Sequence, residues 1–181
     1  VATGDVIRLE HWETRRNLHS HNVVGHVAKG RQLEVTAFGE AGEGDTNDDW
    51  IVHLSEGADN ALRLQHVCTS KKSAGGNGDG GEEHFGFLHS HALKYPSWGH
   101  GQLEVTNFNG KDGNDLWLVK PRPPPVTPTG LEYGARIKLQ HSSTGCRLHS
   151  HGSRYPTGSK QQQVTCFAGE DDNDWWMVKP R

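Results

Sequence analysis

The chain repeats one pattern three times, and this feature limits its possible folds more than any other. The string LHSH begins at Leu18, Leu88 and Leu148. Each copy follows a string similar to IRLEH, and each precedes one similar to QLEVT and then one similar to NDDWIV. Four strings that recur in the same order in three copies indicate three copies of one structural unit.

The copies are predicted to occupy about residues 4–54, 60–120 and 134–181 of the 181-residue chain. The second copy contains an insertion at about 69–84, whose Gly, Ser and charged residues predict a flexible surface loop. A Pro-rich linker at 120–132 joins the second copy to the third and is expected to be extended. We therefore expect one domain over residues 1–181 rather than two small domains.

Each recurring string has the pattern of a short strand. In IRLEH, the apolar residues Ile7 and Leu9 alternate with charged residues, which is the period of two that a half-buried strand shows. The Gly-rich and Asn/Asp-rich segments between the strings are typical of turns. No segment shows the sustained period of an amphipathic helix. The sequence therefore predicts an all-β protein with four short strands in each repeat and twelve in all.

The repeat number then selects an architecture. One four-stranded unit of about 45–50 residues cannot bury its own apolar face, so the units must share a core. Three units closed around a pseudo-threefold axis form a β-trefoil, and closure removes exposed sheet edges. A three-bladed propeller is the alternative, but propellers normally have at least four blades. The predicted core consists of the recurring apolar residues Ile7, Leu9, Leu18, Val35, Trp50, Val52, Leu62, Leu64, Leu88, Val105, Trp117, Val119, Ile137, Leu139, Leu148, Val164, Trp176 and Val178.

Composition excludes several classes of function. The formal net charge of −3 provides no basic field that would attract nucleic acid. No apolar run approaches the roughly 20 residues of a membrane helix, so we expect no membrane insertion. We recognise no signal peptide at the first residues, as expected for a mature chain, a fragment or a cytosolic protein. Cys146 and Cys166 could form a disulfide in an oxidising compartment, and Cys68 would then remain free.

Five segments together resemble a known family: Ile7–His21, Leu33–Val52, Tyr95–Thr106, Leu148–Thr165 and Asp172–Lys179. They are similar to the MIR domain, the β-trefoil module of protein O-mannosyltransferases, inositol trisphosphate receptors, ryanodine receptors and the stromal cell-derived factor two family. The order of the repeats is shifted cyclically relative to those families. The chain contains neither an ER-retention tetrapeptide nor a catalytic mannosyltransferase segment. The resemblance therefore implies the fold and a binding or interaction role, without a particular partner.

The 13 histidines are unusual for an ordinary soluble domain, and nine of them recur. Because residues two apart in a strand point the same way, we expect both histidines of each LHSH string to point outward. No third ligand recurs beside these pairs, so the pattern does not favour zinc. Bracing of turns by hydrogen bonds to the backbone is the favoured interpretation, and ligand contact in each repeat is the alternative. If most histidines titrate normally, stability or binding should change between about pH 7.5 and 5.

Polar turns precede the recurring tryptophans, and they are the other candidate binding feature. Sugar recognition needs planar polar groups together with an aromatic face. Trp12 and the ligand candidates Tyr95, Trp98, Tyr155 and Trp175 could supply such a face. Asn and Asp also build turns through their own backbone, which is the structural alternative. The candidate ligand-binding residues are His19, His21, Asn47, Asp48, His89, His91, Tyr95, Trp98, Asn114, Asp115, His149, His151, Tyr155, Asn173, Asp174 and Trp175.

Three recurring glutamines, Gln32, Gln102 and Gln162, are expected to bond backbone groups where the repeats meet. The sequence contains no nucleophile elbow and no Walker loop, and no carboxylate pair stands out. It therefore predicts a non-catalytic module, without metal or cofactor, that binds a glycan or glycoprotein through at most one shallow site per repeat. The alternative is a protein-interaction subunit or chaperone cofactor of the secretory pathway, acting through the insertion or the linker. The expected location is secreted or the ER lumen.

Overall fold

The computed structural model describes residues 1–28, 30, 32–55, 57, 60–68, 86–122, 127 and 129–181. The predicted insertion at 69–84 lies outside these residues, as does part of the linker, so the predicted role of both segments stays a prediction. The described residues form twelve strands, which confirms the all-β prediction. The strands are β1 (Val6–His11), β2 (Asn17–Val24), β3 (Leu33–Phe38), β4 (Trp50–Leu54), β5 (Ala61–His66), β6 (Gly86–Lys94), β7 (Leu103–Asn109), β8 (Trp117–Pro121), β9 (Arg136–His141), β10 (Arg147–Arg154), β11 (Gln162–Phe167) and β12 (Trp176–Pro180).

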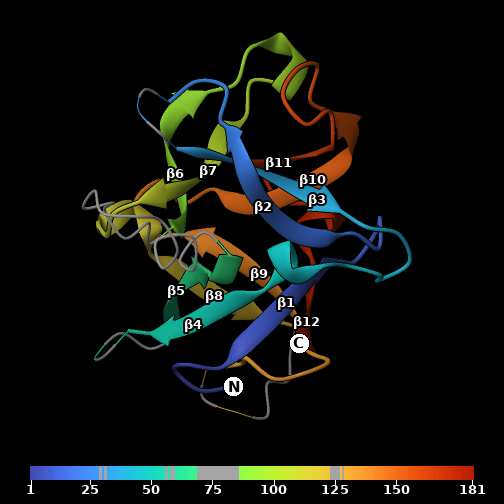
Figure 1. The fold of residues 1–181 in the computed structure, drawn as a ribbon. Coiled ribbons are helices and arrows are strands. Elements are labelled where there is room, and N and C mark those ends of the chain that lie inside the picture. Colours follow the sequence, from blue (N-terminus) through green and yellow to red (C-terminus); the bar gives the residue numbers. More distant parts are fainter. Residues whose placement is uncertain are drawn as a thin grey trace, which may run out of the picture.

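Six of the strands close a barrel. Antiparallel pairing runs from β1 to β4, β5, β8, β9 and β12, and β12 pairs with β1 again. The other six form the hairpins β2–β3, β6–β7 and β10–β11. Strands β3, β7 and β11 pair with one another in a triangle, so the hairpins cap one end of the barrel. In Figure 1 the hairpins occupy the upper half, and the barrel strands and both termini occupy the lower half. This arrangement is the predicted β-trefoil.

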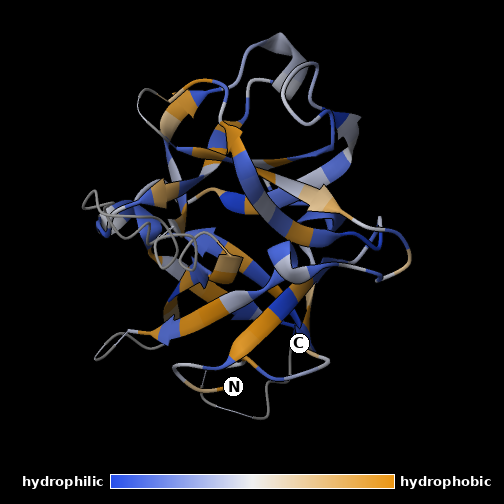
Figure 2. Ribbon diagram, viewed as in Figure 1, coloured by the Kyte–Doolittle hydropathy of each residue, from blue (hydrophilic) through white to orange (hydrophobic). Residues whose placement is uncertain are grey.

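The core confirms the predicted set, because all of its residues are buried and belong to one cluster. Hydrophobic and hydrophilic residues alternate along barrel strands such as β1 and β4 (Figure 2). The indole nitrogens of Trp50, Trp117 and Trp176 donate to the carbonyls of Leu18, Leu88 and Leu148 at 2.9, 3.0 and 2.9 Å. Each of these tryptophans therefore fixes the hairpin of its own repeat to the barrel, because a buried indole N–H needs an acceptor.

Side-chain hydrogen bonds also join the repeats in a ring. The hydroxyls of Thr36, Thr106 and Thr165 each donate to a glutamine of another repeat, and these glutamines are Gln161, Gln32 and Gln102. The expected equivalence of Gln162 with the other two was wrong, because the third repeat is one residue shorter before its VT string. The side chains of Gln32, Gln102 and Gln161 accept from threonine hydroxyls, whereas backbone partners were expected.

A disulfide joins Cys146, just before β10, to Cys166 in β11. Cys68 is a free cysteine at the edge of the described residues.

Among the helices that the structure describes, none has the length and apolar character needed to cross a membrane.

Candidate functional site

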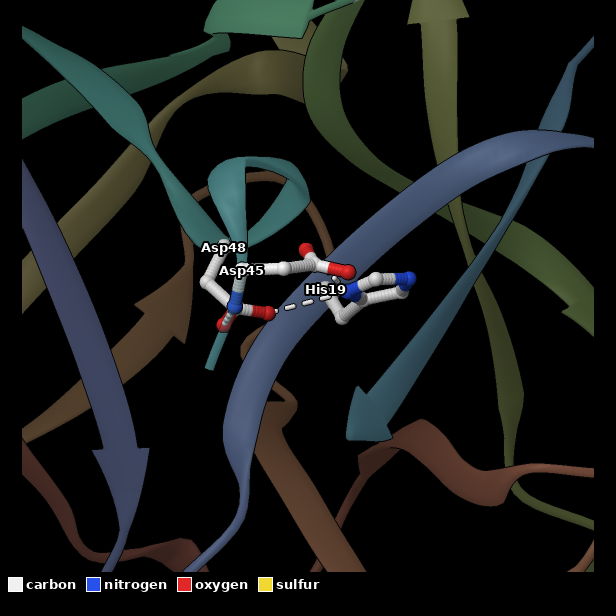
Figure 3. Close-up of side chains that lie close together, drawn as sticks. All are labelled: His19, Asp45 and Asp48. Carbon is white, nitrogen blue, oxygen red and sulfur yellow. Dashed lines mark hydrogen bonds and ion pairs between the residues drawn. The ribbon is translucent and has the colours of Figure 1, made fainter. Parts of the chain in front are cut away.

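Each repeat builds the same polar unit beneath its hairpin. In the first repeat, the short 3-10 helix η1 (Thr46–Asp48) follows Asp45, whose side chain accepts a hydrogen bond from the Asn47 N–H at 2.7 Å. The Asp48 carboxylate accepts from the Asp45 N–H at 2.8 Å, which completes a capping box. The same carboxylate accepts from Nδ1 of His19 at 2.9 Å (Figure 3). The pairs His89–Asp115 and His149–Asp174 repeat this bond at 2.8 and 2.9 Å.

The expectation that both histidines of a pair point outward was wrong for the first of each pair. His19, His89 and His149 are only 2, 4 and 3% exposed. The alternation of β2 predicted that the side carrying His19 faces solvent. In the structure, the turn formed by Asp45 and η1 covers that side, and the other repeats do the same. The turn acids are fully buried as well, so these histidines brace the turns through side chains. The buried turn acids are Asp48, Asp115 and Asp174.

The third recurring histidine of each repeat braces a turn through the backbone, which is the role that we predicted for the histidines of the LHSH pairs. Nε2 of His11, His66 and His141 donates to the carbonyls of Asn173, Asn47 and Asn114 at 2.9, 2.8 and 2.8 Å. Burial disfavours the imidazolium and lowers the pKa of His11 and His66 to about 4. Burial also lowers the pKa of His141. These histidines are therefore neutral at pH 7, and in this form their hydrogen bonds join adjacent repeats.

The recurring units bring three potential metal ligands together. His19, Asp45 and Asp48 place three ligand atoms within 4.8 Å of one another, and both other repeats do the same. In the first repeat, however, Nδ1 of His19 already donates to Asp48. The second oxygen of Asp48 accepts from Asp45 and from Asn17 at 2.8 and 3.3 Å. Because hydrogen bonds engage these atoms, the geometry fits a structural role better than a metal site.

The second histidine of each pair distinguishes the repeats. Nε2 of His21 donates to Glu34 at 3.0 Å, and Nε2 of His91 lies 3.2 Å from Glu104. Burial alone would raise the pKa of Glu34, but hydrogen bonds from His21, His26 and Ser159 lower it to about 2. A neutral glutamine, Gln163, takes the place of these glutamates in the third repeat.

His151, the corresponding histidine of the third repeat, has no such partner. Its Nε2 is buried and has no hydrogen-bond partner within the described parts of the chain. Burial, together with nearby His149 and His100, lowers the pKa of His151 to about 4. These three histidines line an open pocket of about 470 Å³ together with Gln102, Ser153 and Asn173. We name it the third-repeat histidine pocket.

Two aromatic candidates are not available to a ligand. Tyr95 and Tyr155 are 3 and 2% exposed, and their hydroxyls lie 3.0 Å apart. The Tyr155 hydroxyl donates to the Val35 carbonyl at 3.0 Å. The prediction that these rings offer an accessible face was wrong, because they fill the space where the hairpins meet. Trp98 is half-buried, and its ring centre lies 5.0 Å from that of Tyr95.

The remaining candidate, Trp175, lies where the first and third repeats meet. The Trp12 N–H donates to the Trp175 carbonyl at 2.9 Å. The other repeat junctions make the same backbone bond with different side chains, namely Val67 with Asp49 and Ser142 with Leu116. Only one of these three junctions therefore carries two aromatic rings.

An open pocket of about 440 Å³ lies beside these rings, and we name it the Trp12–Trp175 pocket. The guanidinium of Arg136 lies 3.6 Å from the ring centre of Trp12. The ammonium of Lys138 lies 4.5 Å from that of Trp175, so each ring already has a cation on one face. The polar lining residues were not predicted from the sequence because they do not recur, whereas each of the two tryptophans occupies a junction position that an alignment of the repeats identifies. The polar lining residues are Glu13, Arg122, Arg136 and Asp172.

Comparison with known proteins gives consistent results. A family model of the MIR domain matches residues 81–174. The stromal cell-derived factor 2-like protein of Arabidopsis thaliana is 36% identical over 125 residues, which cover 66% of this chain and 49% of that protein. Protein O-mannosyl-transferase 2 of Drosophila melanogaster is 37% identical over 126 residues, which cover 65% of this chain and 14% of that protein. The chain thus spans about half the length of the first relative and a small part of the second.

The crystal structure of the SDF2-like protein from Arabidopsis thaliana matches the fold with a TM-score of 0.76 and 28% sequence identity. The match covers 98% of this chain and 93% of that one.

Proposed function

The chain belongs to the MIR domain family, and from this premise we propose that it is a non-catalytic module that binds a glycan in the Trp12–Trp175 pocket. The observation that carries the proposal is the difference between the three equivalent junctions. Two tryptophans meet at one junction, whereas the others pair Val67 with Asp49 and Ser142 with Leu116. A single glycan site at this junction fits the asymmetry better than one site in every repeat.

The pocket offers the groups that a sugar requires. A pyranose has one apolar face that packs on an aromatic ring, and its hydroxyls both donate and accept hydrogen bonds. Arg122 and Arg136 supply planar donors, and Asp172 and Glu13 supply acceptors. A larger pocket of about 540 Å³ beside Arg16 and Arg154 contains only Phe38 as a ring, and that ring packs on His19. The Trp12–Trp175 pocket is therefore the better sugar site.

The electrostatics support a role without catalysis. A general acid near neutral pH needs a carboxyl group with a raised pKa. Among the described carboxyl groups with a shifted pKa, the shift is downward at Glu34, Glu104 and Glu170. Buried Asp49 lies 2.7 Å from Arg8 and 3.0 Å from Arg181, which neutralise its charge. The three glutamates are therefore poorly suited to donate a proton to a substrate near neutral pH.

The Cys146–Cys166 disulfide supports a location in the secretory pathway, either the ER lumen or outside the cell, because disulfides persist in oxidising compartments. The fly relative is a protein O-mannosyl-transferase, so mannose-containing ligands are the first class to test. One open pocket predicts weak binding to a single sugar and a gain from multivalent presentation.

The test is a glycan array followed by calorimetric titration of each hit. The matched variant is Trp175→Leu, because Leu116 occupies the equivalent position in the second repeat. Trp175→Leu should abolish measurable binding, and Trp98→Leu should leave it unchanged. An array without hits among mannose, galactose and glucan ligands would overturn the proposal, as would binding that survives Trp175→Leu.

A further inference from the structure

We propose that the third-repeat histidine pocket binds one divalent transition-metal ion of the zinc class through His100, His149 and His151. The sequence did not favour metal at the recurring pairs because it showed no recurring third ligand, and the acids that the structure does bring to the first histidine of each pair accept hydrogen bonds instead. The structure supplies a third imidazole that does not recur, since His100 comes from the second repeat and lines the pocket of the third.

His149 is oriented as a metal ligand usually is. Its Nδ1 donates to Asp174 at 2.9 Å, and the other Asp174 oxygen accepts from the Asp171 N–H at 2.8 Å. This fixes the proton of neutral His149 on Nδ1 and leaves a lone pair on Nε2. Metal-binding histidines commonly donate their other nitrogen to a carboxylate in this way. Among the described residues, no hydrogen bond engages Nε2 of His149.

His151 supplies a second nitrogen, and this atom has no hydrogen-bond partner among the residues that the structure describes. Its counterparts His21 and His91 face Glu34 and Glu104. The glutamine in the third repeat, Gln163, instead donates to the carbonyls of Trp98 and Arg154 at 3.2 and 2.8 Å. A buried polar atom without a partner is costly, and a metal ion would satisfy Nε2 of His151.

Binding requires a change of tautomer at His151. The Ser153 N–H donates to Nδ1 of His151 at 3.3 Å, so the proton of the free neutral ring is on Nε2. On metal binding, Nε2 loses this proton and Nδ1 gains one, so the ring stays neutral and no net proton is released. The long hydrogen bond from Ser153 is given up, and a nitrogen–metal bond replaces it.

The spacing of the rings suits a shared ion. The ring centres of His100 and His151 lie 4.7 Å apart, and those of His149 and His151 lie 5.5 Å apart. Two imidazoles on one tetrahedral ion, with Zn–N of about 2.0 Å, have ring centres about 5 Å apart.

His100 provides the adjustment that closes the site. In the described part of the chain, only the His-Asp-Asp groups already hold three ligand atoms within 4.8 Å of one another. His100 is exposed and follows the 3-10 helix η2 (Ser97–Gly99), and its Nε2 makes only a long contact of 3.4 Å with the Ser153 hydroxyl, so its ring can rotate at little cost. Three histidines leave a fourth coordination position for water in this open pocket.

The experiment uses the untagged chain, stripped with EDTA and desalted. Cobalt(II) is titrated by visible absorption, and zinc is titrated by calorimetry. We expect one ion per chain, with d–d bands of four- or five-coordinate cobalt. His100→Asn should weaken binding at least about tenfold, since even losing an outer partner of a metal ligand costs about that much. Asn tolerates the left-handed backbone of His100, which has φ of 57°, so this variant should fold.

Two controls separate this site from the others. His21→Gln removes the counterpart of His151 in the first repeat and should leave cobalt binding unchanged, with near-ultraviolet circular dichroism reporting the fold. Trp175→Leu should also bind cobalt normally, so failure of the glycan proposal would leave this one standing. Absence of saturable binding would overturn the metal site. So would one-ion binding that His100→Asn leaves unchanged, or three ions per chain held by the His-Asp-Asp groups.

Discussion

The first and third repeats share their recurring strings and hairpins, but the second histidine of the LHSH pair has different partners in the two repeats. In the first, a polar chain runs from Asp48 through His19 and His21 to Glu34, with contacts of 2.9, 3.3 and 3.0 Å. In the third, His149 donates to Asp174 in the same way, but among the described residues no hydrogen bond joins His149 to His151, and Nε2 of His151 has no partner.

The exchange of Glu34 for Gln163 accounts for this difference. The common residues stabilise the trefoil, and the departures from the threefold pattern provide the polar atoms that our proposals assign to binding. The junctions between repeats also depart from the threefold pattern. One junction has two tryptophans, whereas the other two have smaller side chains at the equivalent positions.

The largest expected effect comes from breaking the part that the two repeats share. Asp48→Ala removes the carboxylate that accepts from His19, Asp45 and Asn17. Asp174→Ala removes the carboxylate that accepts from His149 and Asp171 in the third repeat. Each variant should lose about 3–5 kcal/mol of unfolding free energy, because buried donors are left unpaired. Urea denaturation measures this loss. A loss below about 1 kcal/mol in either variant would show that the shared unit does not stabilise the fold.

The next effect is the pH dependence of stability in the wild-type chain. His11 and His66 have a folded pKa of about 4, below the unfolded value of 6.5, so the unfolded state binds more protons between these values. Stability should therefore fall as the pH drops below 6.5, by about 2 kcal/mol per histidine at pH 5. Denaturation at pH 7.5 and 5 measures this change, and equal unfolding free energies would contradict it.

Glu34→Gln gives the first repeat the residue type of the third. It removes the carboxylate that accepts from His21 and His26 at 3.0 and 2.7 Å, so we expect a loss of about 1–3 kcal/mol at pH 7. The folded pKa of Glu34 is about 2, so its stabilisation is present above pH 4.5 and disappears as the pH falls toward 2. The variant should therefore match wild type more closely at low pH. A constant difference from pH 7 to 2.5 would exclude the ionised carboxylate as the cause.

The reciprocal change, Gln163→Glu, should have the smallest effect on stability. It offers His151 a carboxylate but removes the donor to the Trp98 and Arg154 carbonyls, and these changes oppose each other. Its clear signature is in metal binding, because an occupied Nε2 competes with the ion. Cobalt titration should show weaker binding than in wild type, and unchanged binding would mean that His151 is not a ligand.

The fold could be predicted because its determinants are local and repeated. Leu18, Val35 and Trp50 recur with the same spacing, and a period of two identifies their buried side. The burial of His19 was missed because the turn that covers it comes from residues 45–48, beyond the reach of strand alternation. Tyr155 was misplaced for a similar reason, since its hydroxyl bonds Val35 from a different repeat.

The candidate sites were harder to predict because they depend on residues that do not recur. Trp175 was identified as a spare aromatic residue, but its neighbours Arg122 and Arg136 carry no repeated signal. His100 likewise has no counterpart in the other repeats, and only the folded chain brings it to His151.

The most direct test of a binding site at an unsymmetrical junction is the indole N–H spectrum of the 15N-labelled chain during titration with the best glycan from the array. The chain has six tryptophans, and three of them donate their indole N–H to buried carbonyls. We predict that the signals of Trp12 and Trp175 move with ligand concentration, while those of Trp50, Trp117 and Trp176 stay in place. Saturable shifts confined to Trp98, or to the three buried indoles, with Trp12 and Trp175 unmoved, would contradict the site.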